Sequence, residues 1–307
     1  MMQTFSVARF LNKAIKNTIL QNFTQLDGSR KFRLVAVSCG FAKNFLQSKI
    51  SSNKPKNFKY GDDAYFICQK PGVADVIGVA DGVGGWRNYG IDPGEFSSFL
   101  MSTCSRLVQS SSFNPERPVS LIASSYNELL EQKDPIMGSS TACVLILNKE
   151  NNMLYAANIG DSGFLVVRKG NIVHQSEEQT HYFNTPYQLS SPFHNSDVLS
   201  DRPESADEIS FPVQKGDVIM VATDGVFDNV PSSILLDTLT QVEGVCDPVK
   251  LQMCANSIAL MARQLSFDSK FLSPFAMNAR KNNINAIGGK PDDVTVVLAT
   301  VADNSGE

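Results

Sequence analysis

The sequence lacks the cysteine and histidine patterns of several common site types. None of its six cysteines forms a Cys-x-x-Cys pair, which argues against a zinc knuckle or a redox dithiol. Six scattered cysteines in 307 residues are typical of reduced, mostly buried thiols. The three histidines, His174, His181 and His194, have no metal-binding spacing. Each is expected on a strand face or the surface, and only His181 is a candidate for a functional test.

Several phosphate-handling motifs and any long apolar segment are also missing. No cysteine is followed six positions later by arginine, which excludes the Cys-x5-Arg phosphatase loop, and no Asp-x-Asp pair starts an aspartyl-phosphate motif. A Walker A loop is excluded because Gly289-Lys290 is followed by Pro291. No apolar run approaches the ~18 residues that a membrane-spanning helix requires. The sequence therefore predicts a protein that is not transmembrane.

Acidic residues are absent from the first 25 positions. On a helical wheel, apolar residues of this segment share one face and Arg9, Lys13 and Lys16 share the opposite one. A basic, acid-free amphipathic N-terminus is the signature of a mitochondrial transit peptide. Residues 1–30 are therefore predicted to direct the chain to the mitochondrion, in the matrix. The alternatives are a basic tail, or a helix packed on the domain, in a cytoplasmic protein.

The rest of the chain has the opposite charge. Residues 1–61 contain eleven basic residues and one acidic residue, whereas the remainder contains 16 basic and 30 acidic residues. An acidic body argues against nucleic acid as a partner, because phosphate backbones need a basic surface. It suits a protein that binds divalent cations.

The order of predicted strands and helices shows no regular βαβ alternation, which predicts an α+β fold with antiparallel sheets. The simplest organisation is a single domain from about residue 35 to residue 303. Residues 175–206 are polar and contain three prolines, which indicates a surface excursion or lid. The predicted helices are 95–108, 118–132 and 248–265. The predicted strands are 32–41, 64–68, 73–80, 141–147, 153–158, 163–168, 171–174, 217–223 and 294–301.

Acidic residues recur where the predicted strands begin or end. Carboxylates packed together repel one another unless a cation neutralises them, and oxygen ligands favour Mg²⁺ or Mn²⁺ over zinc. Two such ions about 3.5–4 Å apart can bridge a water and present hydroxide to a phosphorus atom. The alternative is that each residue separately caps its own turn. The set consists of Asp62, Asp63, Asp81, Asp161, Asp224, Asp292 and Asp293.

These turns match a known family in both sequence and order. The chain closely resembles the metal-dependent PPM-type (type 2C) serine/threonine protein phosphatases over nearly its whole length from about residue 35. Residues 181–189 and the Gly84-Gly85-Trp86 turn are similar to the mitochondrial Ptc-seven branch. The matching segments are 61–64, 79–85, 138–142, 157–162, 222–228 and 291–295.

The resemblance implies a four-layer αββα sandwich, with two central antiparallel β-sheets flanked by helices and a dinuclear Mn²⁺ or Mg²⁺ site at one end. By position, Asp81 would bridge both ions, and Asp81, Asp224 and Asp292 would be the catalytic carboxylates. Asp228 and Asp293 would support the ligands or serve the structure alone. The remaining metal ligands implied are the Gly82 carbonyl with Asp62 or Asp63 for one ion, Asp224 and Asp292 for the other, and Asp161 for a weaker third ion.

Two departures from the family pattern concern the phosphate and the proton donor. Many members carry histidine directly after the Asp-Gly pair, where this chain has Val83. A metal-bound water or another group must then protonate the leaving oxygen. Many also carry an arginine shortly before the first acidic pair, where this chain has Phe58 and Lys59. Lys59 or Arg87 is therefore predicted to bind phosphate, although lysine lacks the bidentate fork of arginine.

The predicted function is hydrolysis of phosphoserine and phosphothreonine in a phosphoprotein, by direct attack of a metal-bridging hydroxide. The alternative is a catalytically weak or dead pseudophosphatase that binds a partner through the same fold. Val83 and the missing arginine favour this alternative, whereas the complete acid set opposes it. No sequence feature indicates an obligate interface, so a monomer is predicted.

Overall fold

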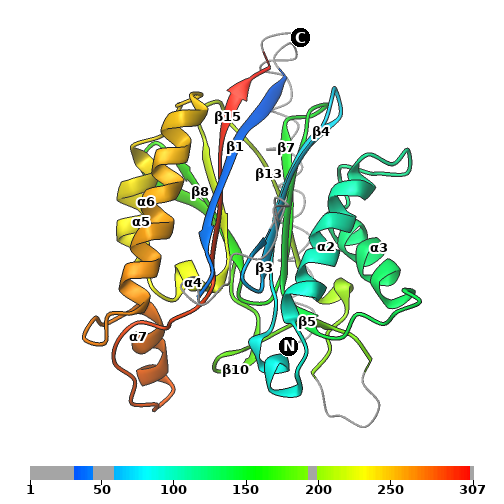
Figure 1. The fold of residues 1–307 in the computed structure, drawn as a ribbon. Helices are drawn as coiled ribbons and strands as arrows, with labels where there is room; N and C mark the ends of the chain where they lie inside the picture. The colour runs from blue at the N-terminus through cyan, green and yellow to red at the C-terminus, as the bar shows by residue number, and fades with distance from the viewer. Residues whose placement is uncertain (1–30, 44–58, 193–198, 305–307) are drawn as a thin grey trace, which may run out of the picture.

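The computed structural model describes residues 31–43, 59–192 and 199–304. The prediction of a transit peptide over residues 1–30 lies outside this part of the chain. Within it, two antiparallel β-sheets stand face to face, and helices cover the outer face of each (Figure 1). This arrangement confirms the α+β class and the αββα sandwich predicted from the resemblance.

In the described chain, one sheet has five strands and the other has six. The order of the first is β1 (Phe32–Phe41), β15 (Val294–Asp303), β14 (Val218–Ala222), β8 (Gly163–Arg168) and β9 (Asn171–Gln175). The order of the second is β13 (Asp207–Pro212), β7 (Met153–Ile159), β6 (Ala142–Asn148), β4 (Ala74–Asp81), β3 (Asp63–Lys70) and β2 (Lys59–Tyr60).

The outer layers and the connections hold the helices and the shortest strands. Helices α2 (Pro93–Val108) and α3 (Pro118–Leu130) cover the six-stranded sheet, and α5 (Ser232–Thr240) and α6 (Pro248–Ser266) cover the five-stranded one (Figure 1). The remaining elements are η1 (Gly84–Tyr89), β5 (Ser139–Ser140), β10 (Thr180–Tyr182), β11 (Thr185–Pro186), β12 (Leu189–Ser190), η2 (Pro203–Ser205), α4 (Asp224–Phe227) and α7 (Pro274–Lys281).

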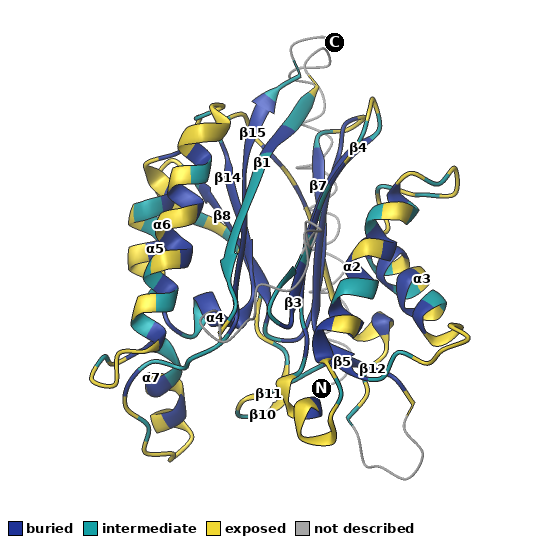
Figure 2. Ribbon diagram, in the orientation of Figure 1, coloured by how far each residue is buried: buried dark blue, intermediate teal, exposed yellow. Residues whose placement is uncertain are grey.

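Central strands are mostly apolar because both of their faces are buried (Figure 2). In β4, Val76 packs toward α2 and α3, while its neighbour Ile77 packs between the two sheets. In β14, Met220 packs toward α6, while Ile219 faces the other sheet. Successive strand side chains point to opposite faces, so each central strand serves two cores. This explains why these strands appear in the sequence as continuous apolar runs.

The structure adds to the predicted elements and corrects one of them. The four strands predicted between residues 141 and 174 are divided between the sheets, with β6 and β7 in one and β8 and β9 in the other. The described part of 175–206 is not merely a polar surface excursion: Leu189 is fully buried, and β12 pairs with β5. Elements β13, α5 and α7 were not predicted. Strand β13 shows no apolar run because it lies at the sheet edge with only Phe211 buried.

Candidate active site

Three carboxylates from separate turns meet at one end of the sandwich. Asp81 is the last residue of β4, Asp224 opens α4 directly after β14, and Asp161 lies where the chain crosses from β7 to β8. Among the described residues, one oxygen of each lies within 4.8 Å of those of the other two. The residues belong to both sheets, so the packing of the sandwich itself assembles the group.

Hydrogen bonds fix the backbone of Asp81, so that its carboxylate points toward those of Asp161 and Asp224. The Asp81 N–H donates to Thr141 Oγ1 at 3.0 Å, and the Thr141 N–H donates back to the Asp81 carbonyl at 3.0 Å. The Ser140 hydroxyl also donates to this carbonyl, at 2.8 Å. Thr141 Oγ1 lies 2.7 Å from Ser162 Oγ, next to Asp161. The strand ends that carry the two acids are thus joined through their neighbours.

Gly82 occupies a position that excludes a side chain. A Cβ atom there would lie 2.7 Å from the carbonyl oxygens of both Asp62 and Pro93, closer than real contacts allow. The Gly82 N–H donates to the Asp62 carbonyl at 3.2 Å, which joins this turn to the start of β3. Gly82 lines the cleft above the acids, so its backbone can contact a ligand there.

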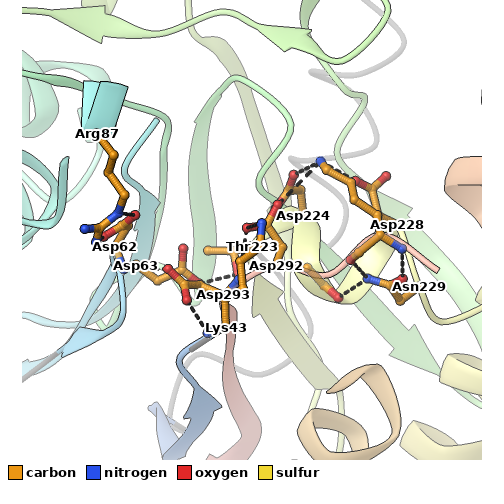
Figure 3. A network of polar contacts seen from close by, with 12 residues as sticks. Lys43, Asp62, Asp63, Arg87, Thr223, Asp224, Asp228, Asn229, Asp292 and Asp293 are labelled. Carbon is orange, nitrogen blue, oxygen red and sulfur yellow. Dashed lines mark hydrogen bonds and ion pairs between the residues drawn. The ribbon is translucent and has the colours of Figure 1, made fainter. Parts of the chain in front are cut away.

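The neighbours Asp62 and Asp63 have different surroundings (Figure 3). Asp63 pairs with Asp81 across β3 and β4 and is only 1% exposed. Its Oδ2 accepts hydrogen bonds from the Thr223 and Thr295 hydroxyls at 2.7 and 2.8 Å. Asp62 lines the cleft, and its carboxylate accepts from the Arg87 guanidinium, with Arg87 Nε at 2.9 Å from Asp62 Oδ2. Asp63 therefore lies under the acid group, and Asp62 lies at its edge.

The Asp292-Asp293 pair ends the loop before β15. Asp293 holds the backbone in place: its carboxylate accepts from the N–H groups of Lys43 at 2.5 Å and Asp62 at 2.6 Å (Figure 3). Asp292 lines the cleft, with an oxygen 3.9 Å from Lys43 Nζ. Asp293 therefore holds the backbone of Lys43 and Asp62, whereas Asp292 lines the cleft.

The electrostatics of the group favour a bound cation. Burial, and then the nearby Asp224, raise the pKa of Asp81 well above its usual range. Burial, reinforced by Asp224, raises the pKa of Asp161 in the same direction and that of Asp292 to about 6. In the described part of the chain, buried oxygens of Asp63, Asp161 and Asp224 have no hydrogen-bond partner. Clustered, unpartnered carboxylate oxygens suit a hard divalent cation, which would bind them and relieve their repulsion.

The two predicted phosphate-binding residues are placed differently. Arg87 lines the cleft beside Asp62, and its side chain is 57% exposed. Lys59 does not line this cleft, and its ammonium lies 3.6 Å from Asp92 Oδ2 at the start of α2. Val83 lines the cleft with an aliphatic side chain. His181 lies outside the cleft lining, 3.0 Å from Asp201 Oδ2.

Several residues of the site were not predicted from the sequence. Lys290 contacts Asp224 and Asp228, and Asn229 fixes the backbone of Lys290. Thr223 and Thr295 bind Asp63 from the opposite sheet. The sequence indicates them only by their position, because each lies within two residues of a predicted acidic residue. Their contacts with the acids depend on the tertiary packing.

Similarity to known proteins agrees with this fold. Residues 52–265 match the protein phosphatase 2C family. A protein phosphatase PTC7 homolog of Danio rerio is 48% identical over 305 residues, covering 99% of each chain. The photosystem II phosphatase PBCP is 28% identical, with a TM-score of 0.72, over 87% of this chain and 98% of its own. The catalytic domain of the phosphatase PstP, solved with two manganese ions, shares the fold at 17% identity, with a TM-score of 0.54 over 90% of this chain and 100% of its own.

The αββα sandwich, with acidic turns gathered at one end, and the family match together place the protein in the class of phosphatases. The chain belongs to the protein phosphatase 2C family, and the curated relatives that it matches along its length are PTC7 homologs. This confirms the family predicted from the acidic turns, and with it a protein phosphatase that acts on phosphoproteins. In the described part of the chain, no helix has both the length and the apolar character needed to cross a bilayer.

Proposed function

We propose that this protein is a serine/threonine phosphatase that depends on Mn²⁺ or Mg²⁺. The observation that carries the proposal is the convergence of Asp81, Asp161 and Asp224 within 4.8 Å, with buried oxygens of Asp161 and Asp224 unpartnered in the described residues. Such a set costs folding free energy unless it binds a cation, so a purely structural role does not explain it. We further propose one catalytic domain over residues 35–303, acting as a monomer.

The residues present suit two divalent ions. Asp81, at the centre of the group, would contact both. The other candidate ligands divide by position into the Gly82 carbonyl with Asp62 or Asp63 on one side, and Asp224 with Asp292 on the other, with Asp161 beside them. When bound, such ions supply positive charge to a phosphate group and activate water for direct attack on phosphorus. The protein itself fixes Asp81 through Thr141 and presents the acids in a cleft of about 830 Å³.

The experiment that tests this function is hydrolysis of a phosphothreonine peptide by the purified protein. We expect phosphate release with Mn²⁺, and loss of release when a chelator removes the metal. A protein that binds Mn²⁺ but releases no phosphate would instead support the pseudophosphatase alternative. Activity that is unchanged by the chelator would contradict metal dependence.

Arg87 is the better of the two proposed phosphate-binding residues because it lines the cleft, whereas Lys59 does not. Charge-assisted hydrogen bonds contribute about 1.5–3 kcal/mol, so Arg87→Ala should lower kcat/KM by about 10- to 100-fold. The matched control is Lys59→Ala, which removes a cation near the same helix start and should change kcat/KM less than about threefold. Steady-state kinetics on one phosphopeptide compares the two variants. The reverse order of effects would assign phosphate binding to Lys59.

We also propose that residues 1–30 direct the protein to mitochondria. The support is the basic amphipathic sequence of its first 25 residues, which contain no acidic residue. In an import assay with isolated mitochondria, the full chain should become protected from protease in a manner that requires membrane potential. Replacing Arg9, Lys13 and Lys16 with glutamine should reduce that protection severalfold. Full protection of the substituted chain would contradict the proposal.

A further inference from the structure

A lysine side chain lies inside the acidic centre, in the described part of the chain. Lys290 Nζ lies 2.5 Å from Asp224 Oδ2, 2.7 Å from Asp228 Oδ2 and 3.8 Å from Asp292 Oδ2. Its side chain is only 17% exposed, whereas that of Lys43, on the other side of Asp292, is 47% exposed. One ammonium therefore touches three carboxylates of a single cluster.

The fold holds Lys290 in this place by its backbone. Asn229 is fully buried; its Nδ2 donates to the Lys290 carbonyl at 2.9 Å, and its Oδ1 accepts from the Lys290 N–H at 2.8 Å. The same Nδ2 lies 3.0 Å from the Gly225 carbonyl, so the lysine is tied to the turn that carries Asp224. Asp224, Asp228 and Asn229 lie together at one end of the network in Figure 3. Phe275 adds a cation–π contact, with the ammonium 5.3 Å from its ring centre.

The two carboxylate oxygens of Asp224 have different surroundings because only one of them contacts Lys290. Oδ2 accepts from the Lys290 ammonium, while Oδ1 is buried and has no partner among the described residues. One oxygen of Asp224 lies within 4.8 Å of Asp81 and Asp161 oxygens, as a shared ligand set requires. Asp224 therefore has one oxygen available to a metal ion, while the other is engaged by Lys290.

We infer that Lys290 is a positioning residue that acts as a fixed cation on the Asp224–Asp228 side of the acidic centre. There it excludes a divalent ion and confines metal binding to the side of Asp81. This inference rests on the proposed metal-dependent function. The weaker third ion implied by the family resemblance would need Asp161 together with oxygens that Lys290 engages. An ammonium held 2.5–2.7 Å from two carboxylates takes that place.

Removal of the ammonium should therefore change the number of bound ions. Without Lys290, Asp224, Asp228 and Asp292 would face one another with no cation between them, which lowers the stability of the metal-free protein. The same carboxylates would then be free to bind one more divalent cation. Because a cation that binds only the folded state stabilises it, added Mn²⁺ should raise the Tm of such a variant more than that of the wild type.

The test compares Lys290→Met with Lys43→Met in the full chain, using Mn²⁺ alone as the probe. Isothermal titration calorimetry should show one more Mn²⁺ per chain for Lys290→Met than for the wild type, and no change for Lys43→Met. The rise in Tm between chelator and saturating Mn²⁺ should be larger for Lys290→Met by about 5 °C or more. Lys43 is a matched control because its ammonium also lies near Asp292 but contacts no other described acid closely.

Two further variants keep the test decisive if Lys290→Met fails to fold. The double variant Lys290→Met/Asp228→Asn removes one charge of each sign, so it should fold and bind as many Mn²⁺ ions as the wild type. Lys290→Arg retains the cation and should also keep the wild-type number. An unchanged ion count in Lys290→Met, or an extra ion in Lys290→Arg, would overturn the inference while leaving the phosphatase function intact. A wild type that binds no Mn²⁺ would overturn both.

Discussion

Asp81→Asn should abolish phosphatase activity while leaving the protein folded. The substitution keeps the size of the side chain but removes the central charge of the group, and metal ions stabilise such transition states by several kcal/mol. A loss of about 4 kcal/mol corresponds to a fall in kcat of about 10³-fold. Phosphothreonine peptide hydrolysis at saturating Mn²⁺ measures this fall. Activity within about tenfold of the wild type would contradict the role of Asp81.

The Tm of the same variant shows whether activity is lost through the metal site or through unfolding of the protein. Because burial raises the pKa of Asp81, its ionised form costs folding free energy in the metal-free protein. In chelator, Asp81→Asn should therefore have a Tm equal to or above that of the wild type, and Mn²⁺ should no longer raise it. The matched control is Asp92→Asn, since asparagine also caps a helix and Asp92 is half exposed at the start of α2. It should leave hydrolysis and the response to Mn²⁺ nearly unchanged.

Gly225→Ala should lower both the stability of the protein and its affinity for Mn²⁺. A Cβ atom at Gly225 would lie 1.9 Å from the carbonyl oxygen of Asp293, so the backbone on one side must move. Overpacking of this kind costs about 1–3 kcal/mol, and more where only backbone can yield. The movement would also separate Asp224 from Asp292, since each adjoins one of the clashing residues. Thermal unfolding should show a Tm several degrees lower, and calorimetry a weaker Mn²⁺ interaction.

The control for this variant is Gly85→Ala, at a glycine that lines the cleft beside Asp224. Nothing lies within 4 Å of a Cβ atom built on Gly85, and its backbone does not require positive φ. This substitution should change stability by less than about 0.5 kcal/mol. If Gly225→Ala matched it in Tm and Mn²⁺ affinity, the close approach of the two turns would not be important for the site.

The features predicted well from the sequence are those that depend on neighbouring residues. An apolar run followed by Asp-Gly marks a buried strand that ends in a turn, and this pattern located Asp81 and Asp224 without knowledge of the fold. Helical spacing of apolar residues located α2, and in the structure Asp92 Oδ1 caps its start by accepting from the Gly94 N–H at 3.0 Å. Short elements with mixed faces, such as α7, lacked a comparable signal.

The features that were missed depend on contacts between distant parts of the chain. Thr223 and Thr295 bind Asp63 across sequence separations of 160 and 232 residues, so no local pattern could reveal them. The choice between Asp62 and Asp63 depends on which face of the chain each occupies at the start of β3. In the sequence, Lys290 was considered only as part of a Walker A motif, which Pro291 excludes. Its role depends on Asp224 and Asp228 arriving from another strand and helix.

The most direct test of the metal site is a crystal structure of the protein soaked with Mn²⁺, with anomalous diffraction measured at the manganese edge. Two anomalous peaks are expected in the cleft, about 3.5–4 Å apart and both next to the Asp81 carboxylate. No peak is expected where Lys290 contacts Asp224 and Asp228. Peaks away from Asp81, or no peak in the cleft at saturating Mn²⁺, would contradict the proposed site.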